Sequence, residues 1–207
     1  MRKPIFSILL VFLLCGAIPL SCDLFCRDSC GCKAPTPSPG FSIKSMSLES
    51  QVQGESGFDP QSHYPHEKYF KSLGVMDHEF STMLDRGGKG PFFIPLAFAC
   101  DPVPSRSKQK ISAVKITSKK ALAVSPSLSI LENEDISPLF VWSDHPAAIG
   151  VALNDFLAYR SQMFLDVRHY FRFTPIPDGE ASLTFDLEVS FDDGTKLYWT
   201  DEEMRIK

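Results

Sequence analysis

The sequence has no surplus of positive charge. Its 207 residues carry 21 lysines and arginines against 25 aspartates and glutamates, which gives a net charge of −4. This acidic balance argues against nucleic acid or an anionic lipid surface as the main partner. Hydrophobic residues make up 43% of the chain and aromatic residues 12%. The chain is therefore not of the disordered class, and its length suits one domain with its own core.

The sequence also lacks the common catalytic and cofactor motifs. It contains no Gly-x-Ser-x-Gly, no His-Glu-x-x-His, no phosphate-binding loop ending in Lys-Ser or Lys-Thr, and no Gly-x-Gly-x-x-Gly. Ser143, Asp144 and His145 supply the residue types of a catalytic triad, but neighbours in sequence cannot converge as the proton relay requires. We therefore predict a polar turn there, and we assign neither catalytic residues nor a cofactor.

Histidines are few, and one group of them has a spacing reminiscent of metal ligands. His63 and His66 stand three residues apart beside Glu67, and His78 follows. Pro65 lies between the first two and disfavours the helical turn that would bring them together. We predict no metal site from these residues.

No apolar run is long enough to form a membrane-spanning helix of about 20 residues. Residues 1–21 begin with Arg2 and Lys3 and continue with the apolar run from Ile5 to Leu14, a pattern typical of a signal peptide. The sequence Leu20-Ser21-Cys22 then resembles a bacterial lipobox. This resemblance implies that a diacylglycerol is attached to the Cys22 thiol and that residues 1–21 are removed. The alternative is a secreted protein cut near the same point by an ordinary signal peptidase.

A lipid on Cys22 would fix the location of the protein. Several acyl chains, palmitate being one example, would anchor it stably, because each buried CH₂ group contributes about 0.8 kcal/mol. Residues 22–40 would then be a lipidated, cysteine-rich and proline-rich tether. We expect a lipid-anchored protein of the bacterial cell envelope, with the outer membrane as the favoured site and the choice between its periplasmic and surface faces open.

Five of the six cysteines lie in the first 32 positions, so the rest of the chain has almost none. Four remain after Cys15 and Cys22 are set aside, namely Cys26, Cys30, Cys32 and Cys100. In an oxidising envelope we expect disulfides among them, and three pairings are open. A bridge from Cys100 to the early group would pin the tether to the domain. Free thiols or a metal site are the alternatives.

Residues 41–207 have the sequence pattern of a β-rich domain. Apolar side chains occupy every second position from Leu183 to Phe191, a turn follows at 192–195, and a returning strand at 196–200 completes a hairpin. Further strands are expected at 41–48, with a bulge near Ser45, and at 91–100, 110–117, 136–142 and 165–173. Pro138 would confine residues 136–142 to an edge, and only 151–160 has a helical pattern. We predict a mainly β, immunoglobulin-like β-sandwich with one or two short helices.

Residues 50–90 are predicted to form a long insert in that domain. Tyr69, Phe70, Leu73 and Val75 have helical spacing, so the insert is expected to contain a short helix. The insert is where we first look for a binding surface. Exposed aromatic residues would form it, and the candidates are Tyr64, Tyr69, Tyr198 and Trp199, although a buried or cross-strand position is the alternative for each.

The layout as a whole resembles an uncharacterised family of Bacteroidota-type envelope lipoproteins. The features that carry this resemblance are the lipid anchor, the cysteine-rich start, the central strands, the Leu-Asn-Asp-Phe-Leu helix at 153–157 and the closing Asp-Asp-Gly-Thr hairpin. The resemblance implies location and fold but no activity. We expect a non-enzymatic binding or structural module whose partner is an envelope protein or a glycan. The alternative is an envelope hydrolase or glycan-handling protein with an unrecognised site.

Overall fold

The computed structural model describes residues 39–55, 57–80 and 104–207. The predicted signal peptide, the lipidation site Cys22, the cysteines Cys26, Cys30, Cys32 and Cys100, and the predicted strand at 91–100 lie outside these residues. Apart from Pro104, the described residues belong to one compact unit. No helix among them is long and apolar enough to cross a membrane.

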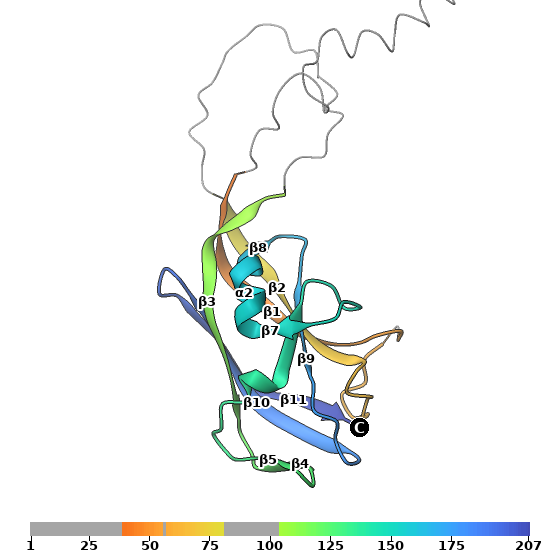
Figure 1. Cartoon of the computed structure of the whole chain (residues 1–207). Helices are drawn as coiled ribbons and strands as arrows, with labels where there is room; N and C mark the ends of the chain where they lie inside the picture. The colour runs from red at the N-terminus through yellow and green to blue at the C-terminus, as the bar shows by residue number, and fades with distance from the viewer. Residues whose placement is uncertain (1–38, 56, 81–103) are drawn as a thin grey trace, which may run out of the picture. The chain divides into compact units, whose positions relative to one another are not determined.

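The predicted class, a mainly β sandwich with one or two short helices, is confirmed (Figure 1). The described part of the chain has one α-helix, α2, and one short 3₁₀ helix, η1. The elements in chain order are β1 (Phe41–Val52), β2 (Tyr69–Phe80), β3 (Arg106–Ser118), β4 (Leu122–Ser125), β5 (Leu128–Ile130), η1 (Ser137–Leu139), β6 (Phe140–Ser143), β7 (Val151–Ala152), α2 (Leu153–Arg160), β8 (Gln162–Phe164), β9 (His169–Phe173), β10 (Ala181–Phe191) and β11 (Lys196–Ile206).

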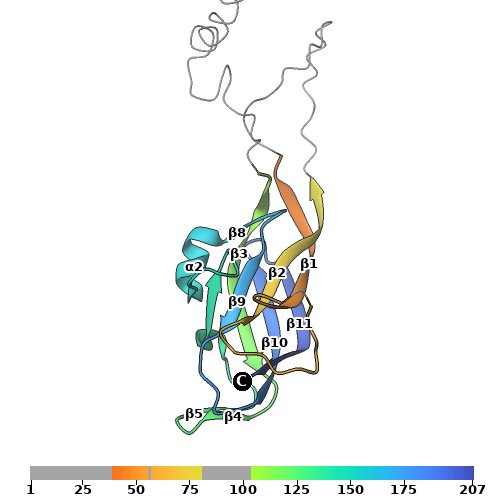
Figure 2. The ribbon, with the colours of Figure 1, turned by 90° about the vertical axis from the view of Figure 1, so that its right-hand side faces the viewer.

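Two ladders of strands pack their apolar faces together. One ladder runs β1-β2-β9-β6-β7 and the other β3-β10-β11, and a parallel pairing of Phe41 with Ser107 joins them into one continuous sheet. Phe140 of β6 meets Phe185 of β10 with ring centroids 6.0 Å apart, so the inner faces of the two ladders are in contact. Figure 2 shows β9 and β2 in front of β10 and β3. The small β4–β5 hairpin lies at the end of this unit opposite to the start of β1 (Figure 1).

The β10–β11 hairpin confirms the clearest prediction from the sequence. Leu183, Phe185, Leu187 and Val189 are fully buried, and the polar residues between them are not. The turn contains Gly194 at φ +87°, a backbone conformation that glycine adopts without strain. β11 is longer than expected and has a bulge opposite Asp186, where Asp201 adopts a positive φ of 56° and its amide donates to the Asp186 carboxylate at 3.0 Å.

The irregularity expected near Ser45 is also confirmed. The pairing of β1 with β2 shifts register on both sides of Ser45, between Ile43 and Met46. Such a bulge lets the apolar residues of a strand return to the core face after their alternation has changed phase.

The predicted short helix in the 50–90 insert is wrong, because residues 69–80 form strand β2 in the middle of the first ladder. The first six residues of β2 are all buried, so no alternation marks it as a strand. Arg168 covers its outer side, donating to Ser72 Oγ at 3.1 Å and to Glu49 Oε1 at 2.6 Å. Residues 81–90 of the insert lie outside the described part of the chain.

Two predicted strands are shorter than expected, and the predicted helix is confirmed. Of residues 165–173 only 169–173 form a strand, and of residues 136–142 only the last three belong to one. Pro138 lies in η1, which leaves β6 free to pair on both sides, with β7 and β9. Helix α2 accounts for most of residues 151–160, and its buried Phe156 packs on Trp142.

The outer edge of β11 is covered by the segment that leads into β2. Tyr64 pairs with Ile206 in a parallel bridge, and its amide donates to the carbonyl of Arg205 at 3.0 Å. The Tyr69 hydroxyl donates to the carbonyl of Glu203 at 3.1 Å. The segment 58–68 therefore lies against the end of β11, and this contact positions the candidate site.

Candidate functional site

Two of the predicted surface aromatics are not exposed. Tyr64 is 7% exposed and Tyr69 only 1%, so both belong to the core, and the prediction that they present a surface is wrong. Trp199 lies opposite Leu187, half-buried on the core side of β11. Tyr198 does point to solvent, at 59% exposure, on the other face of the same strand. Tyr64 points inward because the backbone of the 58–68 segment pairs with the end of β11.

A cavity of about 180 Å³ opens beside these tyrosines. It lies between the 58–68 segment, strands β1 and β2 and the end of β11. Its lining combines apolar rings with hydroxyl groups and charged side chains, contributed by Ser50, Phe58, Pro60, Tyr69, Lys71, Glu203 and Arg205. A second cavity, beside Phe70 and Tyr170, holds only about 10 Å³.

The charged groups around the cavity are paired with one another. Lys71, which is 4% exposed, donates from Nζ to Glu202 Oε2 at 2.6 Å. The Arg205 guanidinium donates to both oxygens of Glu203, at 3.1 and 3.3 Å, and to the backbone and side-chain oxygens of Gln61. The cavity wall therefore contains two ion pairs, in which each positive group has a negative partner. A ligand would not meet an excess of positive or negative charge.

The apolar side of the cavity is an aromatic cluster. Phe58, which is 37% exposed, lies against Tyr64 and Tyr69 with centroid distances of 5.7 and 5.5 Å. The Tyr69 hydroxyl bonds to Ser50 Oγ at 3.2 Å as well as to the Glu203 carbonyl, and burial raises the pKa of this hydroxyl to about 12. The cavity thus presents a fixed neutral hydroxyl beside an accessible aromatic face.

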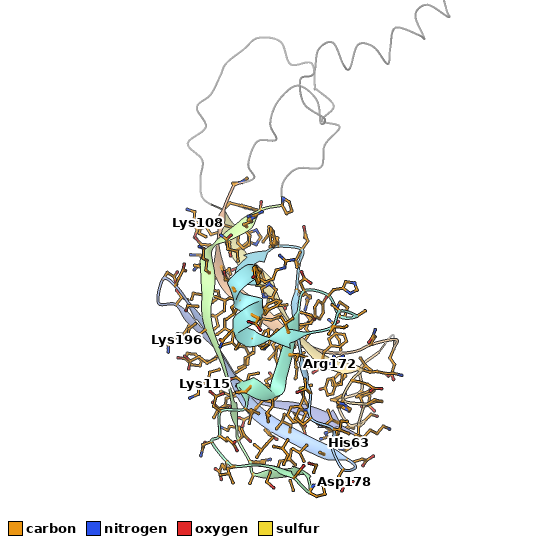
Figure 3. The ribbon with its side chains drawn as sticks, viewed as in Figure 1. His63, Lys108, Lys115, Arg172, Asp178 and Lys196 are labelled. Carbon is orange, nitrogen blue, oxygen red and sulfur yellow. The ribbon has the colours of Figure 1, made fainter. Side chains whose placement is uncertain are left out.

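A second cluster lies next to the cavity and contains His63. Its Nε2 is 3.4 Å from Ser182 Oγ, and its Nδ1 is 3.6 Å from Glu180 Oε2. Ser182 is the second residue of β10, and Glu180 directly precedes that strand. Figure 3 labels His63 at the lower right of the molecule, near Asp178 in the turn before β10, whereas Lys108, Lys115 and Lys196 lie on the left.

The other histidines considered as metal ligands do not join His63. The ring of His78 lies between Phe41 and Phe80, at centroid distances of 5.4 and 4.8 Å, on the far part of the β1–β2 pair. Within residues 39–55, 57–80 and 104–207, no three histidine, cysteine or acidic side chains are grouped so that they could hold a metal ion.

The adjacent Ser143, Asp144 and His145 form a turn, as predicted. The Ser143 hydroxyl donates to the carbonyl of His145, and His145 Nδ1 accepts from the amide of Ala147. Asp144 accepts from Arg160 Nε at 2.8 Å, and this contact with Arg160 holds the pKa of the carboxyl below its ordinary value. Of the three side chains, Asp144 links this turn to α2 through Arg160.

A further buried polar group lies beneath α2. His169 is 1% exposed, its Nδ1 has no hydrogen-bond partner among the described residues, and the same holds for Nε1 of Trp142. The His169 ring packs edge-on against Phe156 at 4.8 Å, and Trp142 stacks on Phe171 at 4.6 Å. Burial lowers the pKa of His169 to about 4.

The sequence contains a signal for one part of these sites, the buried ion pair of Lys71. A lysine within the apolar run Tyr69 to Val75 is a signal for a buried ion pair, because a lysine is almost never buried without a partner. Nothing in the sequence pairs it with Glu202, 131 residues away, or brings His63 to Ser182.

Comparisons with known proteins identify no family. No family model matches the sequence, and no curated protein matches it. Among solved structures, the chain is similar to the C-terminal domain of the antigen I/II polypeptide BspA of Streptococcus agalactiae, with 13% identity, 81% of this chain and 49% of that chain covered, and a TM-score of 0.22. It is also similar to the C-terminal domain of the antigen I/II-family protein AspA of Streptococcus pyogenes, with 10% identity, 77% and 46% covered, and a TM-score of 0.22. The chain spans about half the length of these structures, and at such TM-scores the similarity carries no argument about function.

Proposed function

We propose that the protein is a bacterial envelope lipoprotein, anchored through a lipid on Cys22, whose β domain binds a neutral sugar unit of a glycan. The observation that carries the proposal is the cavity beside Tyr69, in which an exposed aromatic ring, two hydroxyl groups and balanced ion pairs meet. The acidic charge and the signal sequence support an envelope location away from nucleic acid.

The charge balance of the wall favours a neutral ligand. An anionic ligand would have to compete with Glu203 for Arg205, and a cationic ligand would have to compete with Lys71 and Arg205 for the carboxylates. Displacing either ion pair leaves a charge without its partner in a partly buried site, which is unfavourable. A neutral ligand with many hydroxyl groups can form hydrogen bonds with the carboxylate oxygens and N–H groups that face the cavity. The Lys71–Glu202 and Arg205–Glu203 pairs then stay in place.

The shape of the cavity favours a small unit with one apolar face. Drug-sized ligands occupy pockets of roughly 300 to 1,000 Å³, so a cavity of about 180 Å³ would enclose one sugar ring or less of a longer chain. The C–H face of a pyranose can lie on the Phe58 ring, and its hydroxyls can reach Ser50 and Glu203. Pairs of aromatic rings gain about 0.5 to 1.5 kcal/mol beyond the area that they bury, and we take this as the order of magnitude for the contact of the sugar with Phe58.

Titration of the mature protein with sugars, followed by amide NMR, tests the cavity. Glucose, galactose and N-acetylglucosamine are the neutral probes, and glucuronate and glucosamine are the charged ones. We expect at least one neutral sugar to shift the amide signals of Tyr69 and Arg205, with weaker shifts from the charged sugars.

Phe58→Ala should weaken that binding about 5- to 10-fold, since it removes the aromatic face. Tyr198→Ala, which removes an exposed aromatic ring that does not line the cavity, is the matched control and should bind as the parent does. Equal binding by Phe58→Ala, or shifts confined to residues away from the cavity, would overturn the proposed site.

The anchor is tested separately by Cys22→Ala in a bacterial host fed labelled palmitate. We expect the label to be absent from the variant and the uncleaved precursor to accumulate, whereas Cys15→Ala should be labelled as the parent is. Continued incorporation into Cys22→Ala would show that the lipid is elsewhere and would leave the cavity proposal untouched.

A further inference from the structure

His63, Ser182 and Glu180 are arranged as a nucleophile, a base and an orienting carboxylate. One ring nitrogen of His63, Nε2, faces the Ser182 hydroxyl at 3.4 Å, and the other, Nδ1, faces the Glu180 carboxylate at 3.6 Å. A serine activated for nucleophilic attack has this order of contacts. Both distances exceed the shortest hydrogen bonds, as they often do in such sites before substrate is bound.

We propose that these three residues form a hydrolytic site for carboxylic esters, with Ser182 as nucleophile, His63 as general base and Glu180 as the residue that orients the imidazole. The three come from separated parts of the chain, unlike the adjacent Ser143, Asp144 and His145. Ser182 is exposed, so an ester can approach it without a movement of the sheet.

The chemistry balances without any other reactant than water. Ser182 Oγ forms a bond to the ester carbonyl carbon as its proton passes to His63 Nε2, and the Nδ1 proton faces Glu180. Collapse of the tetrahedral intermediate breaks the ester C–O bond, and the leaving alcohol takes the proton from Nε2. Water then attacks the acyl-serine with His63 again as base, which releases the carboxylic acid and restores Ser182.

The register of β10 with β11 places a cation next to the nucleophile. Ser182 lies directly opposite Arg205, so their side chains share one face of the hairpin. A guanidinium is one of the groups able to stabilise a developing oxyanion. Arg205 also lines the cavity, so an O-acyl group on a sugar held there would lie close to Ser182. This choice of substrate rests on the proposed sugar site, whereas the reactivity of Ser182 does not.

The same strand contains a matched serine without the histidine. Ser190 follows Glu188 as Ser182 follows Glu180, on the same face of β10. Its hydroxyl donates to Glu188 Oε1 at 3.1 Å, and Lys196 Nζ binds the same oxygen at 2.6 Å. Among the described residues, no histidine ring is within hydrogen-bond distance of Ser190. General reactivity of accessible serine hydroxyls would therefore appear at the half-buried Ser190 as well as at Ser182, and base activation only at Ser182.

The test is labelling of the mature protein with a fluorophosphonate probe, followed by peptide mass mapping. The hydroxyl oxygen forms the bond to phosphorus and fluoride leaves. We expect the adduct on Ser182 and none on Ser190, and we expect Ser182→Ala to lose both the adduct and the hydrolysis of p-nitrophenyl acetate. Ser190→Ala should retain both.

Two further variants separate a role in activation from a role in folding. His63→Gln keeps a polar side chain in the segment and should lower the labelling rate about 100-fold or more, in the range of general base catalysis. Tyr159→Ala, at an exposed position of α2 outside both sites, should retain labelling. Labelling of Ser182 no faster than that of Ser190, or hydrolysis unchanged in Ser182→Ala, would overturn the hydrolytic site while leaving the sugar site standing.

Discussion

Two regions of the domain that bury polar side chains differ in how these groups are bonded. Beside the cavity, Lys71 is buried but its ammonium is paired with Glu202, and Tyr69 bonds to two oxygens. Beneath α2, Nδ1 of His169 and Nε1 of Trp142 are buried with no partner among the described residues. The charged groups beside the cavity therefore have partners. Beneath α2 the groups are neutral, and two of their nitrogen atoms have no hydrogen bond to the described residues.

The difference follows from the cost of desolvation. A buried charge without a partner costs several kcal/mol, so a lysine can be buried only with a carboxylate. A neutral N–H or ring nitrogen without a partner costs about 1 to 3 kcal/mol, which close aromatic packing can offset. The region beside the cavity thus keeps polar contacts that a ligand can share, while the region beneath α2 is an apolar attachment for the helix.

The largest expected effect on stability comes from replacing Glu202, the more exposed partner of the Lys71–Glu202 ion pair. Glu202→Gln leaves the Lys71 ammonium buried, at 5% side-chain exposure, without a carboxylate. We expect the free energy of unfolding to fall by about 3 to 5 kcal/mol, measured by urea denaturation. Lys71→Met should cost less, because Glu202 is 24% exposed and can be hydrated when its partner is absent.

The Lys196–Glu188 pair is the matched control for that prediction. It has the same 2.6 Å distance but is exposed, with side-chain exposures of 50% and 29%. Glu188→Gln should cost at most about 1 kcal/mol, in the range of surface pairs. Equal losses in Glu202→Gln and Glu188→Gln would mean that burial does not distinguish the two pairs.

The next largest effect is a loss of stability at low pH, caused by the burial of His169. Burial lowers the pKa of His169 to about 4 in the folded protein, against an ordinary value of 6.5. The unfolded chain therefore binds a proton more readily, and stability is complete above pH 6.5 and falls as the pH drops toward 4. The shift corresponds to about 3 kcal/mol, measured as the free energy of unfolding across this pH range.

His169→Gln removes the titrating group and should flatten that pH dependence, although the variant is less stable at neutral pH. A parent protein whose stability does not change between pH 6.5 and 4.5 would contradict the burial of a neutral imidazole.

The smallest effect is expected at Tyr69. Tyr69→Phe keeps the ring and removes the hydroxyl that bonds to Ser50 and to the Glu203 carbonyl. We expect the free energy of unfolding to fall by about 1 kcal/mol, measured by thermal or urea denaturation. Sugar binding should also weaken, because the cavity loses a hydroxyl group. Tyr159→Phe, at an 84% exposed position of α2, should change neither. Unchanged stability and binding in Tyr69→Phe would remove this hydroxyl from the site.

The sequence predicted the elements whose two faces differ and missed those whose faces do not. The β10 strand has one apolar and one polar face, so its alternation identified it, and the change of phase near Ser45 identified the bulge in β1. The first half of β2 is buried on both sides, by the core and by Arg168, and its run of apolar residues was open to interpretation as a helix.

The candidate sites were less predictable, because they depend on pairing between distant strands. Tyr64 lies in a polar segment and Tyr69 begins the apolar run that follows it, so composition alone left the exposure of both open. Their burial follows from the bridge between Tyr64 and Ile206, which no local pattern encodes. The contacts of His63 with Ser182 and Glu180 arise from the same bridge, across 119 residues of sequence.

The way Tyr64 and Tyr69 cover β11 also affects how copies of the protein would behave at high local density. An open strand edge is a template on which another chain can add a strand. Here the backbone of Tyr64 and the hydroxyl of Tyr69 occupy the outer carbonyls near the end of β11, and the bulge at Asp201 interrupts the straight edge before it. Copies of the protein at high concentration would then find no long free edge on β11 for sheet-to-sheet aggregation.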